Sequence, residues 1–536
     1  MRRRHAPTPR PDPAAIEGAL SGLSAEELRD AVRHALLELD DRAHARVVNR
    51  LIDRAARGDS GWMPSPPQRK KVAEIVSFAE SAVADGWADP PVVDGHLREG
   101  SSAFLNRDYA AAFTIFHALL PPVSECEIDL GQHEMVEEVL GVEVADCAAQ
   151  YVVSMYMTAA PARRADAVYK AMRQILGLGH FWKPLQEMER VAIEPLPEFA
   201  DFLERWRNVL EKDVPRERRG DWDTDEDRWL REVVQRTEGT KGLERIARST
   251  KRADDLQSWC STLMAGKDWE GALSAYEEAA ESVTDREYWR GEFLDGAALA
   301  AWELGRKDVP VRLERAWREA PTMLRLRRRL GSAGSRAAVR RFAAKALKTC
   351  PEAVHRQRAF LHVVLGDFQQ AAKLLSAAPG LGWSGPEHPG HLLFPVFAAL
   401  LAADDTELVS GLRAHADRSM VFEEIEEGLP PAREPRIDAP GVDEILEAAG
   451  ADAVNPGARK AVLEAMRKAA EKRLAGVAEN KRRRHYGHAA LLVGACSAVD
   501  PDSAAADWVA AVRAMYSRYP ALQREFDGAL RDRGDG

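Results

Sequence analysis

The sequence Ala265-Gly-Lys-Asp-Trp-Glu-Gly-Ala-Leu-Ser-Ala-Tyr-Glu-Glu-Ala-Ala280 decides the fold that we expect. Directly after a glycine-containing turn, it places Trp269, Ala272 and Tyr276 at the spacing of one helical face. A face that combines large and small side chains packs closely against a preceding helix. The stretch therefore predicts the second helix of a helical hairpin, and a scaffold of stacked hairpins rather than an active site.

Two other segments share this pattern, and all three resemble the tetratricopeptide repeat. That family has a glycine in the first helix, then an aromatic residue, Ala, a large residue and Ala in the second. The three copies are Gly100, Tyr109, Ala112, Phe116 and Leu119; Cys260, Trp269, Ala272, Tyr276 and Ala279; and Ala359, Gly366, Phe368, Ala371, Leu375 and Ala378. Leu119 replaces the final alanine, and Cys260 replaces the glycine. The resemblance implies stacked hairpins that bind another protein, although generic pairs of amphipathic helices would show similar faces.

Helical periodicity dominates the whole chain, so we expect an all-α protein. Its fold class would be an α-solenoid of stacked antiparallel hairpins with helical modules at both ends. Ser24-Ala-Glu-Glu27 is a capping box that opens one helix. The predicted segments are a disordered arm (1–13), an N-terminal helical pair (14–57), a linker (58–67), a helical domain with one repeat-like hairpin (68–212), a charged linker (213–224), tetratricopeptide-like repeats (225–427), a Pro-rich linker (428–440) and a C-terminal helical module (441–536).

The composition limits the possible partners and the compartment. The formal net charge of -10 argues against general binding to nucleic acid or to an anionic membrane. No apolar run is long enough to cross a membrane or to serve as a signal peptide. The five cysteines form no Cys-x-x-Cys motif, which fits a reducing cytoplasm.

A second, looser resemblance concerns the C-terminal end. The segments Arg484-His-Tyr-Gly-His-Ala-Ala490 and Tyr519-Pro-Ala-Leu-Gln523 are similar to the closing helices of bacterial SWIM zinc-finger proteins. The zinc-binding motif of that family is absent from this chain. The resemblance therefore implies neither a metal site nor nucleic-acid binding.

One acidic segment matches part of a calcium-binding loop. Its carboxylates at the first, third, fifth and twelfth loop positions are Asp221, Asp223, Asp225 and Glu232. However, Glu226 stands where the loop needs glycine. Because Thr224 and Asp227 also fit a capping box, we expect a helix start here rather than a calcium site.

The remaining candidate sites lack part of their motif. Gln132-His-Glu-Met-Val-Glu-Glu138 has no second metal-binding histidine, so we expect an exposed helical face. The loop Gly382-Trp-Ser-Gly-Pro386 lacks the strands that flank a serine nucleophile. His388 and His391 could share a metal ion, but no further ligand is evident. We therefore name no catalytic, cofactor-binding or metal-binding residue.

Two basic runs and several tryptophans remain. Lys481-Arg-Arg-Arg-His485 and Arg325-Leu-Arg-Arg-Arg329 indicate charged helical faces that are solvated or paired within the chain. Contact with an acidic partner or with nucleic acid is the alternative. The loop tryptophans are expected to pack on helix ends, and they are Trp62, Trp87, Trp222 and Trp383.

Together these observations predict a cytoplasmic, non-catalytic scaffold or adaptor that binds another protein on a curved surface of hairpins. The sequence does not distinguish the binding residues from the packing residues. Two alternatives stay open. The chain is a regulatory or defence-associated protein controlled by cleavage at the linkers 58–67 and 428–440 or by release of a bound factor. Alternatively, it is a helical enzyme without a recognisable motif.

Overall fold

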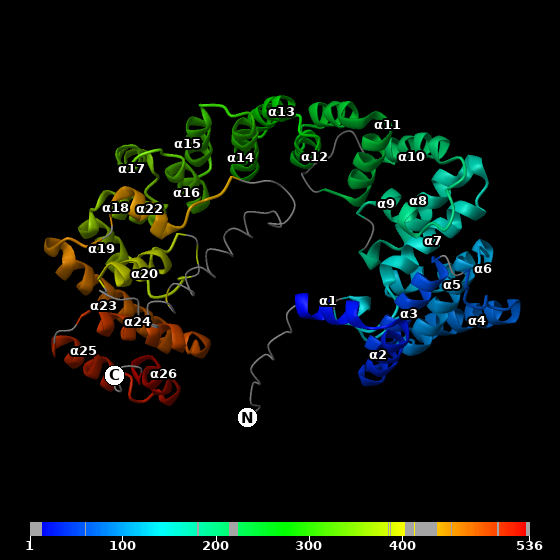
Figure 1. Ribbon diagram of the computed structural model, residues 1–536, viewed down its shortest axis with the longest axis horizontal. Helices are drawn as coiled ribbons and strands as arrows, with labels where there is room; N and C mark the ends of the chain where they lie inside the picture. Colours follow the sequence, from blue (N-terminus) through cyan, green and yellow to red (C-terminus); the bar gives the residue numbers. More distant parts are fainter. Residues whose placement is uncertain are drawn as a thin grey trace. The chain divides into compact units, whose positions relative to one another are not determined.

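The computed structural model describes residues 13–58, 61–133, 135–179, 182–213, 223–383, 385, 387–401, 412, 437–451, 453–500 and 503–531. This part of the chain consists of α-helices, short 3-10 helices and connecting loops (Figure 1). It contains no β-strand, only an isolated bridge between Trp87 and Asp129. The all-α prediction is confirmed for these residues. Of the predicted disordered arm, only Pro13 is among the described residues. Most of the predicted linkers 213–224 and 428–440 also lies outside them, including Asp221 and Trp222.

The chain divides into two compact units, Met1–Ile246 and Ala247–Gly536. The helices of the first unit are α1 Pro13–Gly22, α2 Ala25–Glu38, α3 Asp41–Ala56, α4 Arg69–Asp85, α5 Pro90–Leu105, α6 Tyr109–Ser124, η1 Val136–Glu138, α7 Val144–Thr158, η2 Pro161–Arg163, α8 Arg164–Gln174, η3 Leu176–Leu178, α9 Pro184–Val191 and α10 Phe199–Asp213. Helix α11, Asp225–Thr250, contains the division between the units.

The second unit is helical throughout its described residues. Its helices are α12 Ala253–Ala265, α13 Trp269–Ser282, α14 Glu287–Glu303, α15 Val309–Glu319, α16 Met323–Gly331, α17 Arg336–Thr349, α18 His355–Leu365, α19 Phe368–Ala377, α20 Gly390–Leu401, α22 Val442–Ala449, α23 Pro456–Glu479, η4 Arg483–His485, α24 Tyr486–Val499, α25 Ser503–Met515 and α26 Pro520–Arg531. None of the described helices in either unit combines the length and the apolar character needed to cross a membrane.

The division between the units follows the charged segment 213–224 instead of lying within it. The first half of α11 packs on the first unit, where Trp229 and Trp206 are fully buried with ring centroids 6.2 Å apart. The carboxylate of Glu232 accepts hydrogen bonds from two backbone N–H groups at the start of α9. At Gly239, φ is 64° and ψ is -152°, a conformation that only glycine adopts readily. The helix therefore kinks there, before the second unit begins.

The N-terminal module has three helices where the sequence predicted a pair, because α1 precedes the two expected helices. The capping box is present as predicted. The Ser24 N–H donates to Glu27 Oε2 over 2.8 Å, and the Glu27 N–H donates to Ser24 Oγ over 3.3 Å. These two bonds satisfy backbone donors that the first turn of α2 leaves free.

The three repeat-like segments form the helix pairs α5/α6, α12/α13 and α18/α19, and their turns share one geometry. The residue before the cap is left-handed in each, namely Arg107, Lys267 and Gly366, with φ of 61°, 57° and 79°. The next residue is an aspartate whose side chain accepts a hydrogen bond from the backbone N–H three residues later; the three are Asp108, Asp268 and Asp367. The hairpins thus repeat in conformation, beyond the spacing of their aromatic residues.

A fourth helix pair, α23/α24, uses the same turn with a different residue at the cap. Lys481 is left-handed with φ of 53°, and Arg482 has φ of -84° and ψ of 65°. The Arg482 N–H bonds to the Val477 carbonyl over 2.9 Å, as the Asp108 N–H bonds to Ala103 over 3.0 Å. The basic run 481–485 therefore occupies a turn and the short helix η4, not the face of a long helix.

Gly100 shows why a glycine is useful in the first helix of such a pair. A Cβ atom at this position would lie 2.8 Å from the ring of Phe116, closer than side chains tolerate. The glycine lets α5 approach the aromatic residue of α6 directly. Phe116 is fully buried as a result.

Candidate functional site

Helix α3 is attached to the rest of the first unit by polar bonds. Within α3, Arg42 donates to the carbonyl group of Glu138, Arg46 to that of Glu137 over 3.3 Å and Asn49 to that of Gly141 over 3.4 Å. Directly after the helix, Arg57 donates to the carbonyl group of Arg190 over 3.0 Å. Arg50 adds an ion pair with Glu143 at 2.7 Å. Ala45, Val48 and Ile52 of the same helix are partly buried as well, so α3 attaches through polar and apolar side chains together.

The apolar side chains of α1, α2 and α3 remain partly exposed. These side chains are spaced at helical intervals and form one stripe on each helix. Together we name them the open apolar face. They are Ile16, Leu20 and Leu23 for α1, Leu28, Val32, Leu36 and Leu39 for α2, and Val47 and Leu51 for α3. Seven of them expose between 36% and 46% of their surface, while Leu28 and Leu36 are half-buried. No residue of α2 is buried, although every side chain in this helix is described.

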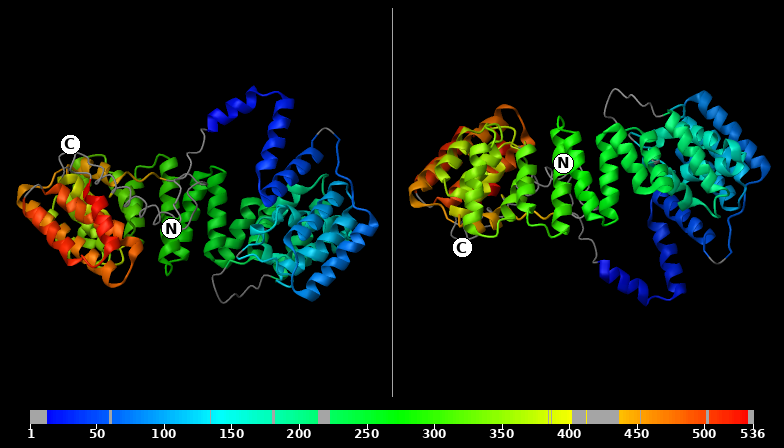
Figure 2. Two further views of the ribbon diagram at one scale, coloured as in Figure 1. Left: turned by 90° about the horizontal axis from the view of Figure 1, so that it is seen from below. Right: turned by 90° about the horizontal axis from the view of Figure 1, so that it is seen from above.

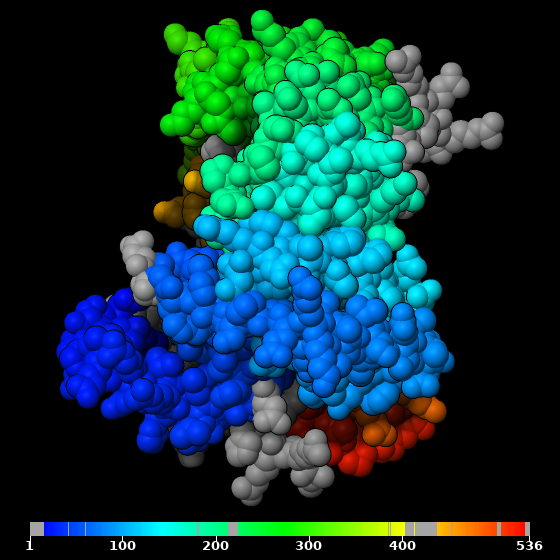
Figure 3. All heavy atoms as spheres, turned by 90° about the vertical axis from the view of Figure 1, so that its right-hand side faces the viewer, coloured from blue at the N-terminus to red at the C-terminus, as the bar shows by residue number. Residues whose placement is uncertain are grey.

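The figures show that two helices of this face project from the first unit. Both views of Figure 2 show α1 and α2 extending away from the helices that follow α3. In Figure 3 their atoms form a dark-blue lobe beside the lighter-blue body of the same unit. Helices α1 and α2 therefore lie at the edge of this unit.

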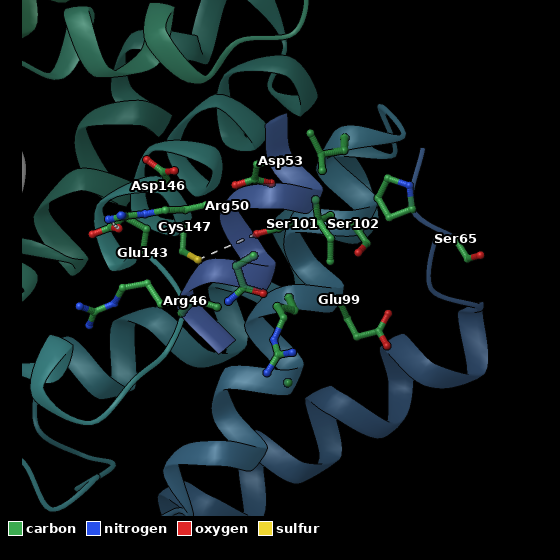
Figure 4. Close-up of a pocket in the computed structure, with 17 residues that line it drawn as sticks. Arg46, Arg50, Asp53, Ser65, Glu99, Ser101, Ser102, Glu143, Asp146 and Cys147 are labelled. Atoms are coloured by element: carbon green, nitrogen blue, oxygen red, sulfur yellow. Dashed lines mark hydrogen bonds and ion pairs between the residues drawn. The ribbon is translucent and has the colours of Figure 1, made fainter. Parts of the chain in front are cut away.

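A polar pocket lies on the opposite side of α3, between it and helices α5 and α7 (Figure 4). Its volume is about 430 Å³. The charged side chains that line it are Arg46, Arg50, Asp53, Arg98, Glu99, Glu143 and Asp146, and the small polar ones are Asn49, Ser65, Ser101, Ser102 and Cys147. Both signs of charge are present, and Ile52, Pro64, Leu105 and Val142 add apolar surface, so the pocket suits a small ligand that combines polar and apolar groups.

Asp53 is the titratable group of most interest in this pocket. Burial raises the pKa of its carboxyl to about 6, and the charge of Asp146 adds to the rise, while Arg57 and Arg190 oppose it. A carboxyl with that pKa exchanges its proton near neutral pH and could act as an acid or a base. It is the one feature of this pocket that recommends the enzyme alternative.

Cys147 does not supply a ready nucleophile. Its thiol is buried, with Sγ at 4.0 Å from Ser101 Oγ, and burial raises the thiol pKa far above its usual range. Reactive cysteines need the opposite, a lowered pKa that favours the thiolate. Cys147 therefore behaves as a buried apolar side chain at the wall of the pocket.

Three buried polar atoms beside the pocket have no hydrogen-bond partner among the described residues: Arg46 Nε, Asn49 Oδ1 and Arg98 Nε. Two donors and one acceptor of this kind would serve a polar ligand or ordered water. No cluster of three or more His, Cys, Asp and Glu in the described part of the chain could hold a metal ion.

The acidic segment that matched part of a calcium loop begins α11 as a capping box. The Thr224 N–H donates to Asp227 Oδ2 over 3.0 Å, and the Asp227 N–H donates to Thr224 Oγ1 over 3.4 Å. Asp223 pairs with Arg231 at 2.7 Å, and Asp225 pairs with Arg228. The capping prediction is confirmed, and the carboxylates of Asp223 and Asp225 are bound by arginine.

His388 and His391 are packed inside the second unit. His388 Nδ1 accepts from the Gly390 N–H over 3.0 Å, and Nε2 donates to the Pro379 carbonyl over 2.9 Å. His391 stacks on His488 with ring centroids 5.2 Å apart. Burial, as the largest cause, lowers the pKa of His388. Both ring nitrogens of His388 are thus used within the protein, which leaves neither for a shared metal ion.

The loop tryptophans differ in how much of their surface is exposed. Trp383, whose ring centroid lies 4.9 Å from that of His388, is 2% exposed and packs as expected. Trp62 and Trp87 are 47% and 53% exposed, so about half of the surface of each side chain is covered. The segment 132–138 differs from the exposed helical face that we expected, because its described residues form a loop and η1.

The basic run 325–329 is paired within the chain. Arg325 is buried, with ion pairs to Asp295 at 2.7 Å and Glu292 at 3.0 Å. Arg327 donates to the carbonyl oxygen of Pro440 over 2.8 Å, and Arg328 donates to that of Ile437 over 2.9 Å. These side chains therefore hold the described end of the Pro-rich linker on α16. No pattern in the sequence indicates these distant acceptors.

The run 481–485 behaves differently, since the side chains of 481–484 are exposed.

Comparison with known proteins adds nothing to these observations, because no protein-family model matches the chain and no curated protein has significant sequence similarity to it.

Proposed function

We propose that this chain is a non-catalytic, cytoplasmic scaffold that binds another protein through its helical surfaces. The proposal includes the tetratricopeptide-like stacking that the sequence predicted. The shared hairpin turn at Asp108, Asp268 and Asp367 supports that stacking, since one local geometry repeated along a chain is the basis of helical-repeat scaffolds.

The observation that carries the proposal is the open apolar face. Exposed apolar patches of several hundred Å² are uncommon on proteins that act alone, and they mark interaction sites. Here the apolar stripes occur in three successive helices, and Val47 and Leu51 remain 36% and 44% exposed although Arg46, Asn49 and Arg50 attach α3 to the first unit. The face is therefore available to a partner.

A co-purification experiment tests the proposal. The intact protein would be isolated from its native cells after cross-linking, beside the variants Val32→Glu and Leu37→Glu. Val32 belongs to the open apolar face, whereas Leu37 lies across α2 from it and is 80% exposed. We expect the wild type and Leu37→Glu to retain the same cross-linked protein, and Val32→Glu to lose it. Equal recovery from all three would contradict the proposal.

A further inference from the structure

From the open apolar face we infer that the protein docked there is a second copy of this chain, so that the scaffold is a homodimer joined through α1, α2 and α3. The inference rests on the proposed function and adds the identity of the partner. Its physical basis is the arrangement of the three apolar stripes and of the charges around them.

The three stripes amount to one half of a hydrophobic core. In a helical bundle, such stripes face one another and become buried. In this module Val32, Leu39 and Leu51 expose 38%, 38% and 44% of their surface. The missing half must present stripes of similar length at similar spacing. The helices α1, α2 and α3 of a second copy present stripes of the same length and spacing. Two identical patches pair about a two-fold axis.

The size of the face fits a dimer. Nine partly exposed apolar side chains offer several hundred Å² on each copy. Two such faces would bury on the order of 1,200 Å² or more together, which reaches the range of specific interfaces. A smaller ligand, such as a single short peptide, would leave much of the face exposed.

The charges on α2 favour an antiparallel copy. Glu26, Glu27 and Asp30 outnumber Arg29 in its first half, whereas Arg33 and Glu38 balance in its second half. When two α2 helices run in opposite directions, the two acidic halves lie apart, each beside the neutral half of the other. Such rim charges add little affinity, but they select orientation and partner.

The experiment measures the mass of the intact protein in solution by light scattering after size-exclusion chromatography, over a range of concentrations. We expect the wild type and Leu37→Glu to have twice the mass of one chain. Val32→Glu on α2 and Leu20→Glu on α1 should raise the dissociation constant about tenfold or more, because each places a charge in the joint core. Circular dichroism of all variants would check that their helices remain formed.

Four outcomes are distinguishable. A dimer that Val32→Glu and Leu20→Glu weaken, and Leu37→Glu does not, supports the inference. A wild-type monomer at every concentration overturns it, yet the proposed function survives if Val32→Glu still loses a cross-linked protein that Leu37→Glu retains. A monomer whose cross-linked proteins are the same in every variant overturns both. A dimer that none of the substitutions weakens also overturns the inference.

Discussion

At the scale of single residues, Asp53 links the polar pocket to pH. Its pKa rises from 3.8 to about 6 in the folded protein, mainly because the carboxyl is buried. Between these two values the folded state binds more protons than the unfolded state. The free energy of unfolding therefore falls as the pH rises from 4 to 6, and the loss persists at neutral pH.

Replacing Asp53 with asparagine should remove this loss. We expect Asp53→Asn to raise the free energy of unfolding at pH 7.5 by on the order of 1 kcal/mol, allowing for the partial exposure of the group. The difference from the wild type should disappear near pH 3.5. Urea titrations at several pH values measure it, with the exposed Asp85→Asn as the control. A gain of the same size at low and neutral pH would show that burial of the charge is not its cause.

At the scale of an element, the α23/α24 turn shows a residue choice that lowers stability. Arg482 occupies the backbone conformation that aspartate has in three other turns, and the described side chain of Arg482 makes no capping hydrogen bond. An aspartate there could accept a hydrogen bond from a backbone N–H in the first turn after the cap and would complement the helix dipole.

We therefore expect Arg482→Asp to stabilise the second unit by about 1 kcal/mol. Arg483→Asp makes the same change of charge one residue beyond the cap and should give a smaller gain from the dipole alone. Thermal and urea unfolding of both variants provide the comparison. Equal gains would mean that charge, and not capping, accounts for the effect.

The predictions that succeeded concern interactions between residues close together in the sequence. The capping boxes at Ser24 and Thr224 and the hairpin faces of Tyr109, Trp269 and Phe368 depend on partners within a few residues or in the adjacent helix. The sequence therefore contains both sides of each interaction. For the same reason, helical periodicity was sufficient to predict an all-α fold.

Features that depend on distant residues were not predicted. Arg46 and Asn49 bond to carbonyl groups more than ninety residues away, and Arg327 bonds to Pro440 over a separation of 113 residues. Backbone acceptors have no side-chain signature, so an arginine that binds them looks like a solvated one. The polar pocket behind α3 and the open apolar face in front of it both follow from that unpredicted attachment.

At the scale of the whole molecule, the position of the division between the units has a consequence for stability. The charged segment 213–224 looks like a natural boundary, yet α11 continues the packing of the first unit beyond it. Trp229 and Val233 are fully buried there, and Arg173 and Arg207 form ion pairs with Glu226 and Glu238. Burial of two such side chains alone contributes about 4 kcal/mol.

A fragment that ends after α11 should therefore fold better than one that ends at the charged segment. We expect residues 1–250 to unfold cooperatively at a clearly higher urea concentration than residues 1–213, because the shorter fragment leaves the buried face of Trp206 without α11. In the matched pair from the other unit, 223–536 should gain little over 247–536, since residues 223–246 belong to the first unit. Circular dichroism during urea titration measures all four fragments. If 1–213 were as stable as 1–250, or if 247–536 failed to fold where 223–536 folds, the first half of α11 would belong to the second unit and the boundary would return to the charged segment.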